Sequence, residues 1–196
     1  ANTTTSLTAT DLTQTTYYRA VVQSGVCDPT FSSIATITVT PASSGGSVAG
    51  SATVCAGTNS TTLTLSGQIG SVVKWQSSLS MDFASPTDIA NTTTSLIATN
   101  LPQTTYYRAI VQSGSDAPAN SSVATITVDP ASVGGNVAGG TTVVAGGNST
   151  TLTLSGQTGL VVKWQSSTTM DFASPTDIAN TTTSLTATDL TQTTYY

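Results

Sequence analysis

The residues that could carry chemistry are few in this chain of 196 residues. It holds four cationic residues, nine aspartates and no histidine. A histidine-based catalytic triad therefore cannot form, and two isolated cysteines cannot build a zinc site. Asp82 and Asp88 could serve as a general acid and base, but no activated nucleophile accompanies them and no apolar segment that would tune their pKa is evident. We predict that the chain is not an enzyme and binds no cofactor.

Lys74 and Arg108 are the cations best placed to bind a ligand. Their positions in alternating runs predict that they lie on neighbouring antiparallel strands with both side chains directed outward. Such a pair could hold an acidic polysaccharide. The alternative is a solvated pair balanced by Asp82 or Asp88, which would matter little at a surface. Four basic residues cannot neutralise a phosphate backbone, so nucleic acid is not an expected partner.

A metal site is not predicted. Calcium needs six to eight oxygen ligands, and neither Asp82 with Asp88 nor Asp129 supplies enough carboxylates. No EF-hand spacing or calcium-binding repeat is present. Calcium at a linker, near Asp129, is left open as the one alternative.

The composition describes an uncharged, hydroxyl-rich chain. Only 7% of the residues are charged, whereas about 25% is ordinary, and 43 threonines with 27 serines make up more than a third of the sequence. Hydrophobic residues form 37% of the chain and recur in ordered patterns, which favours a folded protein over a disordered one. No apolar run approaches the roughly 18 residues of a membrane span, so this segment is not expected to enter a bilayer.

An 89-residue repeat sets the organisation of the chain. The motif Ala1–Leu7 recurs at Ala90–Leu96 and at Ala179–Leu185, and residues 42–89 match residues 131–178 at 38 of 48 positions. The predicted domains are the C-terminal half of one repeat (1–41), a complete repeat (42–130) and the N-terminal part of a third (131–196). We expect the chain to be a window in a longer array. Proline and paired glycines at 40–46 and 129–135 predict linkers with limited bending.

Each repeat has the period of β-structure. Apolar and polar residues alternate at 62–65, 73–75, 107–111 and 124–128, with turn-forming residues between these runs and no helical pattern. Six or seven short strands in about 90 residues predict an all-β fold of tandem antiparallel sandwiches. The expected inward residues are Leu63, Leu65, Val73, Trp75, Ile89, Leu96, Leu101, Tyr107, Ala109, Val111, Ile126 and Val128.

Aromatic residues point to a particular type of sandwich. Trp75, and Trp164 one period later, take the place of the core tryptophan on the third main strand of an immunoglobulin-like domain. Leu101 and Tyr107, with a threonine between them, have the spacing of a tyrosine corner, in which the tyrosine hydroxyl bonds to the backbone upstream. Tyr18 and Tyr196 occupy the position of Tyr107 in the preceding and following repeats. We interpret these aromatic residues as core packing rather than as a sugar-stacking platform.

The loop between the last two strands varies between copies. Val26–Phe31 aligns with Ser115–Asn120, and only the proline is shared. Antibody-type sandwiches place binding loops at this pole. A recognition role for Asp116 and Asn120, and drift of an exposed loop, are both open.

The repeat resembles a known type of bacterial domain. The resemblance lies in Cys55–Gly57, Thr62–Gly67, Gly70–Ser78, Thr15–Cys27 and Ala124–Val128, and it covers the whole chain. These segments are similar to the tandem immunoglobulin-like repeats of very large surface proteins of Bacteroidetes, including gliding-motility adhesins. The resemblance implies a secreted, extracellular protein at the cell surface that acts as a stalk or adhesin. It implies no particular ligand.

The cysteines depart from the pattern of those repeats, which often carry one early and one late cysteine. Cys55 is early and Cys27 is late, but their counterparts one period on are Val144 and Asp116. A Cys27–Cys55 bridge would join different repeats, at a separation expected to exceed the roughly 7 Å that a disulfide allows between Cα atoms. We therefore predict no disulfide and two thiols.

Three functional interpretations follow. The leading one is a non-catalytic stalk or spacer of a bacterial adhesin or fibre, in which many weak contacts raise avidity. Its partners would be neighbouring repeats, surface polysaccharide or other copies of itself. The alternatives are a carbohydrate-binding module, using Lys74 and Arg108 or the variable loop, and a self-associating filament subunit joined through strand edges that carry no charge. Six glycosylation sequons, expected to be unused, lie at Asn2, Asn59, Asn91, Asn120, Asn148 and Asn180.

Overall fold

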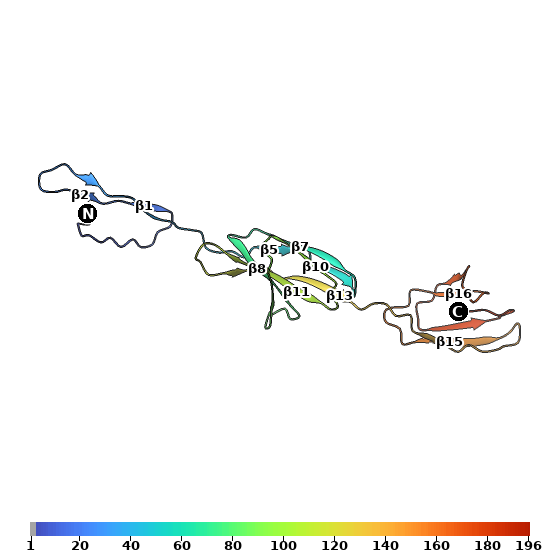
Figure 1. The fold of residues 1–196 in the computed structure, drawn as a ribbon. Coiled ribbons are helices and arrows are strands. Elements are labelled where there is room, and N and C mark those ends of the chain that lie inside the picture. The colour runs from blue at the N-terminus through green and yellow to red at the C-terminus, as the bar shows by residue number, and fades with distance from the viewer. Residues whose placement is uncertain (1–2) are drawn as a thin grey trace. The chain divides into compact units, whose positions relative to one another are not determined.

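The complete repeat forms a two-sheet β-sandwich, in which most neighbouring strands are antiparallel, in the computed structural model, which describes residues 3–196 (Figure 1). One sheet has the strand order β10-β7-β5, and the other has the order β6-β13-β11-β8-β9 with β12 paired to β11. This is the strand arrangement of fibronectin III and immunoglobulin-like domains, so the predicted fold class is confirmed. The strands are β5 (Ser47–Ala49), β6 (Ala52–Cys55), β7 (Ser60–Ser66), β8 (Ser71–Ser78), β9 (Thr87–Ile89), β10 (Ser95–Thr99), β11 (Thr105–Gln112), β12 (Ala119–Asn120) and β13 (Ala124–Asp129).

Residues 3–41 form two short strand pairs. The strands β1 (Thr16–Tyr18) and β4 (Ala35–Ile37) pair with one another, as do β2 (Val21–Val22) and β3 (Thr30–Phe31). Tyr18 is half-buried. Ile37 is 40% exposed, whereas its counterpart Ile126 in the complete repeat is fully buried. This segment therefore has the strand pattern of its repeat without the repeat's core.

Residues 131–196 repeat the topology of the front of the sandwich. The strands are β14 (Asn136–Ala138), β15 (Ser149–Ser155), β16 (Trp164–Ser166), β17 (Thr176–Ile178) and β18 (Ser184–Thr188). The order β14-β15-β18 matches β5-β7-β10, and β16 pairs with β17 as β8 pairs with β9. Leu152, Trp164 and Leu185 form its core, and Tyr196 packs against them.

The core of the complete repeat surrounds Trp75, which is fully buried, as predicted. Its indole Nε1 donates a hydrogen bond to the Thr93 carbonyl at 2.9 Å, and Trp164 makes the same bond to Thr182. Ile89 and Leu101 pack at the edge of the core and Val128 is half-buried. The remaining buried members are Leu63, Leu65, Val72, Leu96, Ala98, Tyr107, Ala109, Val111, Ala124 and Ile126.

Val73 is the one predicted inward residue that faces solvent. It is 44% exposed, whereas Val72 is 7% exposed and lies in the core. The cause is a β-bulge: Ile110 pairs with Lys74, but the next residue, Val111, pairs with Val72. An extra residue on one strand reverses the alternation beyond it. The bulge therefore turns Val72 inward and leaves Val73 outside.

The expected tyrosine corner is replaced by an asparagine clamp. The Tyr107 hydroxyl makes no backbone hydrogen bond within residues 3–196, although Tyr107 is only 5% exposed. Asn59 instead spans the sheet edge, because its Nδ2 donates to the Leu101 carbonyl and its Oδ1 accepts from the Leu101 N–H, both at 2.9 Å. Asn148 makes the same pair of bonds to Leu190. The turn before β11 is thus fixed from β7.

The linker that precedes the complete repeat is shorter than predicted. Ser44 exchanges two backbone hydrogen bonds with Ile69, at 3.1 and 3.0 Å. Gly45 is buried, and a Cβ placed there would lie 1.9 Å from the Asn120 carbonyl oxygen. Gly46 has a φ of 69° and would likewise meet the Ser66 backbone. The paired glycines therefore dock onto the sandwich instead of forming a hinge.

The recurring Asn-Thr-Thr-Thr-Ser motif closes part of a sheet edge. In the pairing of β10 with β7, Asn100 donates to Asn59 and Leu65 donates to Thr94, so the backbone groups of Ser95, Ile97 and Thr99 point away from β7. Side chains of Asn91 and Thr93 both donate to the Ser95 carbonyl, at 2.9 and 2.7 Å. Side-chain hydrogen bonds therefore occupy part of this strand edge and hinder its pairing with another strand. Charged side chains, which often have this role, are absent here.

Candidate functional site

The two predicted cations lie on adjacent antiparallel strands but are already engaged. Lys74 on β8 forms a 2.6 Å ion pair with Asp88 on β9. Arg108 on β11 lies opposite Gln76, and its Nε donates to the Gln76 Oε1 at 2.8 Å. Gln76 in turn donates to the second oxygen of Asp88 at 2.8 Å. A continuous polar ladder therefore joins three strands on the outer face of the sandwich.

Asp88 is the acceptor that holds this ladder together. The hydrogen bond from Lys74, followed by that from Gln76, lowers the pKa of the Asp88 carboxyl below its ordinary value of 3.8. Lys163, Gln165 and Asp177 form the same arrangement one repeat later, with an ion pair of 2.7 Å. Of the two sequence interpretations, the geometry is that of a balanced pair, with Asp88 as the counter-ion.

Arg108 is further fixed by stacking. Its guanidinium carbon lies 4.1 Å from the centroid of the buried Phe83 ring. Phe83 has a φ of 54°, which directs its ring beneath Arg108. Arg19, the counterpart of Arg108 one repeat earlier, stacks on Phe31 at 3.8 Å. Phe31 and Phe83 occupy different positions in the repeat. Arginine stacking on phenylalanine was not foreseen, because these pairs are far apart in the sequence.

Asp116 in the variable loop contacts the linker. Its Oδ2 accepts a hydrogen bond from the Ser43 N–H at 2.7 Å, and the Ser43 hydroxyl accepts from the Ser113 N–H at 2.9 Å. The backbone bond from Ser43 lowers the pKa of Asp116. Asn120 lies in β12 with its side chain exposed, and its backbone covers Gly45. This loop therefore braces the start of the repeat, a role that the sequence did not indicate.

The cysteines and sequons show no site of their own. Cys27 and Cys55 are both exposed thiols without a disulfide. Asn91 uses its side-chain amide within the fold, as do Asn59, Asn148 and Asn180. Asn2 lies outside the described residues. Among residues 3–196, no three His, Cys, Asp or Glu side chains gather as a metal site would require, and no helix is long and apolar enough to cross a membrane.

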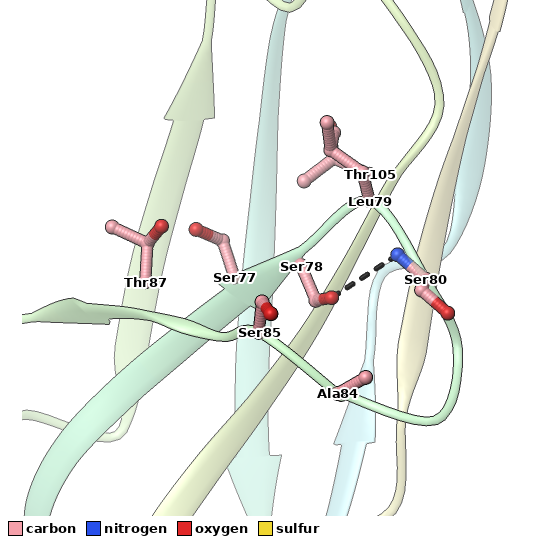
Figure 2. Close-up of a pocket in the computed structure, with 8 residues that line it drawn as sticks. All are labelled: Ser77, Ser78, Leu79, Ser80, Ala84, Ser85, Thr87 and Thr105. Carbon is pink, nitrogen blue, oxygen red and sulfur yellow. Dashed lines mark hydrogen bonds between the residues drawn. The ribbon is translucent and has the colours of Figure 1, made fainter.

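A hydroxyl-lined pocket of about 510 Å³ lies where β8 and β9 meet the loop between them (Figure 2). Its lining contains six serine or threonine residues and no charged residue. Ser77 and Thr87 are directly opposite in the β8–β9 ladder, and their hydroxyls point toward one another. The lining residues are Ser77, Ser78, Leu79, Ser80, Ala84, Ser85, Thr87 and Thr105. Sequence reasoning missed this site because serine and threonine are common throughout the chain.

The loop of the pocket is held rigidly by Asp82. The Asp82 Oδ1 accepts from the Ser80 hydroxyl at 2.5 Å and from the Ala84 N–H at 3.0 Å. These two bonds, the Ser80 bond first, lower the pKa of Asp82. Asp171 makes the same two bonds one repeat later. Asp82 is therefore a structural carboxylate, and the candidate acid–base pair with Asp88 is fully used in other contacts.

Comparisons with known proteins place the repeat in a family. A family model described as a domain of unknown function (DUF8696) matches residues 1–41, 44–130 and 133–196. No curated protein matches the chain. Among solved structures, the FN1–FN3 domains of chicken CNTN1 align with it at 13% identity and a TM-score of 0.30, covering 91% of this chain and 66% of that one.

Proposed function

The chain belongs to the DUF8696 family, and we propose that it is a non-catalytic stalk that spaces weak adhesive surfaces away from a bacterial cell. Its setting would be extracellular, at the cell surface, as part of an adhesin. The tandem β-sandwich fold supports a structural segment. The low charge and the hydroxyl-rich surface suit a spacer that stays soluble through serine and threonine.

The observation that carries this proposal is a strand pair in the larger sheet. It joins β6, the first strand of that sheet along the chain, to β13, the last. β6 is the hydrogen-bonded neighbour of β13. Thr125 donates to the Ser51 hydroxyl at 3.0 Å, and Ala56 donates to the Asp129 carbonyl at 2.8 Å. Both strands therefore advance in the same direction. Tension on the two ends of the repeat shears this pair along its length, so that its bonds resist together.

The docked glycines support the same function. Ser44, Gly45 and Gly46 are held on the sandwich, so the linker before the complete repeat consists only of the few residues around Pro41. Proline restricts the backbone still further. Short, stiff connections suit a spacer, and repeated units allow many weak contacts in one chain to add to the avidity.

Force spectroscopy on the whole chain, held by its two ends, tests the stalk proposal. The complete repeat should unfold in a distinct force peak and release about 300 Å of chain, since an extended chain spans roughly 3.3–3.6 Å per residue. Ala52→Pro should lower the peak force, because alternation directs the Ala52 N–H, like that of Ala56, toward β13. Thr53→Pro is the matched control, since its N–H points away. Equal forces for Ala52→Pro and the unaltered chain would contradict the proposal.

The cellular setting has its own test. Antibodies raised against the chain should label intact, unpermeabilised cells of its source. Labelling that requires permeabilisation would refute the surface assignment and leave the mechanical result untouched.

A further inference from the structure

We propose that the pocket between β8 and β9 binds a neutral saccharide of one or two sugar rings. The inference deepens the stalk proposal by naming the ligand class of its repeated weak sites. It moves the carbohydrate site away from Lys74 and Arg108, which the fold already uses.

Unused hydroxyls are the first argument. Ser77, Ser85 and Thr87 line the pocket, and none of their hydroxyls bonds to another protein group within residues 3–196. The Ser78 oxygen accepts from the Ser80 N–H at 3.1 Å, so its own proton is still available. Hydroxyls both donate and accept, which matches the alternating donors and acceptors of a sugar ring.

Charge and shape define the ligand class. The lining has no ionisable group, and the carboxylates of Asp82 and Asp88 lie in the same region of an acidic chain. The lining itself therefore offers no cation to an acidic sugar, and the nearby cations Lys74 and Arg108 are already bound to Asp88 and Gln76. Leu79, which is 63% exposed, offers an apolar flank for the C–H face of a ring. A volume of about 510 Å³ lies within the usual range of small-ligand sites.

Rigidity is the third argument. The Asp82 bonds fix the loop, the φ of 54° at Phe83 seats its ring under Arg108, and Ser78 is buried at the base. A site that is ordered before binding loses less entropy when the ligand arrives. Hydroxyl contacts alone would give weak binding, and repetition along the chain would raise it.

The next repeat presents the same hydroxyls. Ser166 pairs with Thr176 as Ser77 pairs with Thr87, and Ser174 corresponds to Ser85. Ser80 and Leu79 become Thr169 and Thr168, so the hydroxyl of the loop is retained. Thr169 also keeps the bond to its aspartate, at 2.7 Å.

The experiment titrates the whole chain, labelled with ¹⁵N, against neutral trisaccharides (cellotriose, maltotriose, laminaritriose and mannotriose) and against a trigalacturonate. At least one neutral trisaccharide should bind saturably and shift the amides of residues 77–87. The pocket variant removes three hydroxyls in each repeat: Ser77→Ala, Ser85→Ala, Thr87→Val, Ser166→Ala, Ser174→Ala and Thr176→Val. It should weaken binding by about tenfold or more, since each neutral hydrogen bond is worth roughly twofold to tenfold in affinity.

A matched control removes exposed hydroxyls from the other sheet, and it should leave the affinity unchanged: Thr62→Val, Thr64→Val, Ser66→Ala, Thr151→Val, Thr153→Val and Ser155→Ala. If the six-site pocket variant unfolds, the double variant Thr87→Val with Thr176→Val replaces it, and its affinity for the trisaccharide should fall by about twofold or more. The inference is overturned if no neutral trisaccharide binds, if the pocket variant binds normally, or if only trigalacturonate binds and Arg108→Gln abolishes it. None of these results bears on the force measurement, so the stalk and its ligand can fail separately.

Discussion

Replacing Asn59 by alanine tests what holds the turn before β11. The sequence suggested the Tyr107 hydroxyl, and the structure assigns the task to Asn59. Its amide both donates to and accepts from the backbone of Leu101, at 2.9 Å each, across 42 residues of chain. Asn59→Ala should therefore destabilise the complete repeat, whereas Tyr107→Phe should not.

The magnitude follows from the two bonds. Each is partly buried, and a net hydrogen bond contributes roughly 0.5–1.5 kcal/mol to stability. Asn59→Ala should thus cost about 1–3 kcal/mol, which lowers the Tm of a repeat of this size by roughly 5–20 °C. Tyr107→Phe removes a hydroxyl with no backbone bond, so its cost should stay below about 0.5 kcal/mol.

Urea denaturation of the whole chain, with hydrogen exchange followed peptide by peptide, measures both changes. Exchange should quicken in β7 and β11 for Asn59→Ala and stay unchanged in β15, which has its own clamp at Asn148. Asn120→Ala is the matched control, because it also removes a sequon asparagine but no side-chain hydrogen bond of the described fold. A Tyr107→Phe loss equal to or larger than that of Asn59→Ala would refute the clamp.

Three further outcomes are expected. Val72→Ala should cost about 2 kcal/mol in urea denaturation and Val73→Ala less than about 0.5, and equal losses would contradict the bulge. Gly45→Ala should destabilise the repeat by about 1–3 kcal/mol because its Cβ meets backbone, whereas Gly134→Ala, at the same position one period on with open space around it, should be neutral by calorimetry. Hydrogen bonds in the folded state lower the pKa of several aspartates below 3.8. These aspartates therefore stabilise the fold above that pH, and this stabilisation is lost as the pH falls through their lowered pKa values in the folded state. Melting temperatures should therefore be level near neutral pH and fall only in acid, and a fall that begins at pH 6 would contradict this. These aspartates are Asp82, Asp88, Asp116, Asp171 and Asp177.

The parts of the fold that were predictable from sequence are those set by periodicity. Alternation identified the two sheets and most of the core, and the place of Trp75 in its run identified the sandwich type. The same reasoning failed at Val73, because a bulge depends on how β8 meets β11 and leaves no mark within the strand itself. Pairings across strands are decided by tertiary structure.

The candidate site was less predictable for a related reason. Lys74 and Arg108 stood out because charge is rare, and the sequence offered Asp88 as one of two possible counter-ions, but it gave no sign that Gln76 would bind Arg108. Serines and threonines carried no signal, because they occur everywhere. What distinguishes Ser77 and Thr87 is that they face one another with their hydroxyls unused, and this is visible only once β8 and β9 are paired.

The abundance of short polar residues has a structural cause beyond solubility. Asn91 and Thr93 close a sheet edge, Asp82 orders a loop and Asp116 holds a linker, each through bonds to nearby backbone or hydroxyl groups. Lysine and glutamate have longer side chains that lose more entropy when fixed, and their surface pairs weaken with salt. A repeat braced mainly by short side chains that bond to nearby backbone or hydroxyl groups should therefore keep its turns and edges in order across a wide range of ionic strength. The low charge of this chain is then a consequence of how its turns, loops and edges are built.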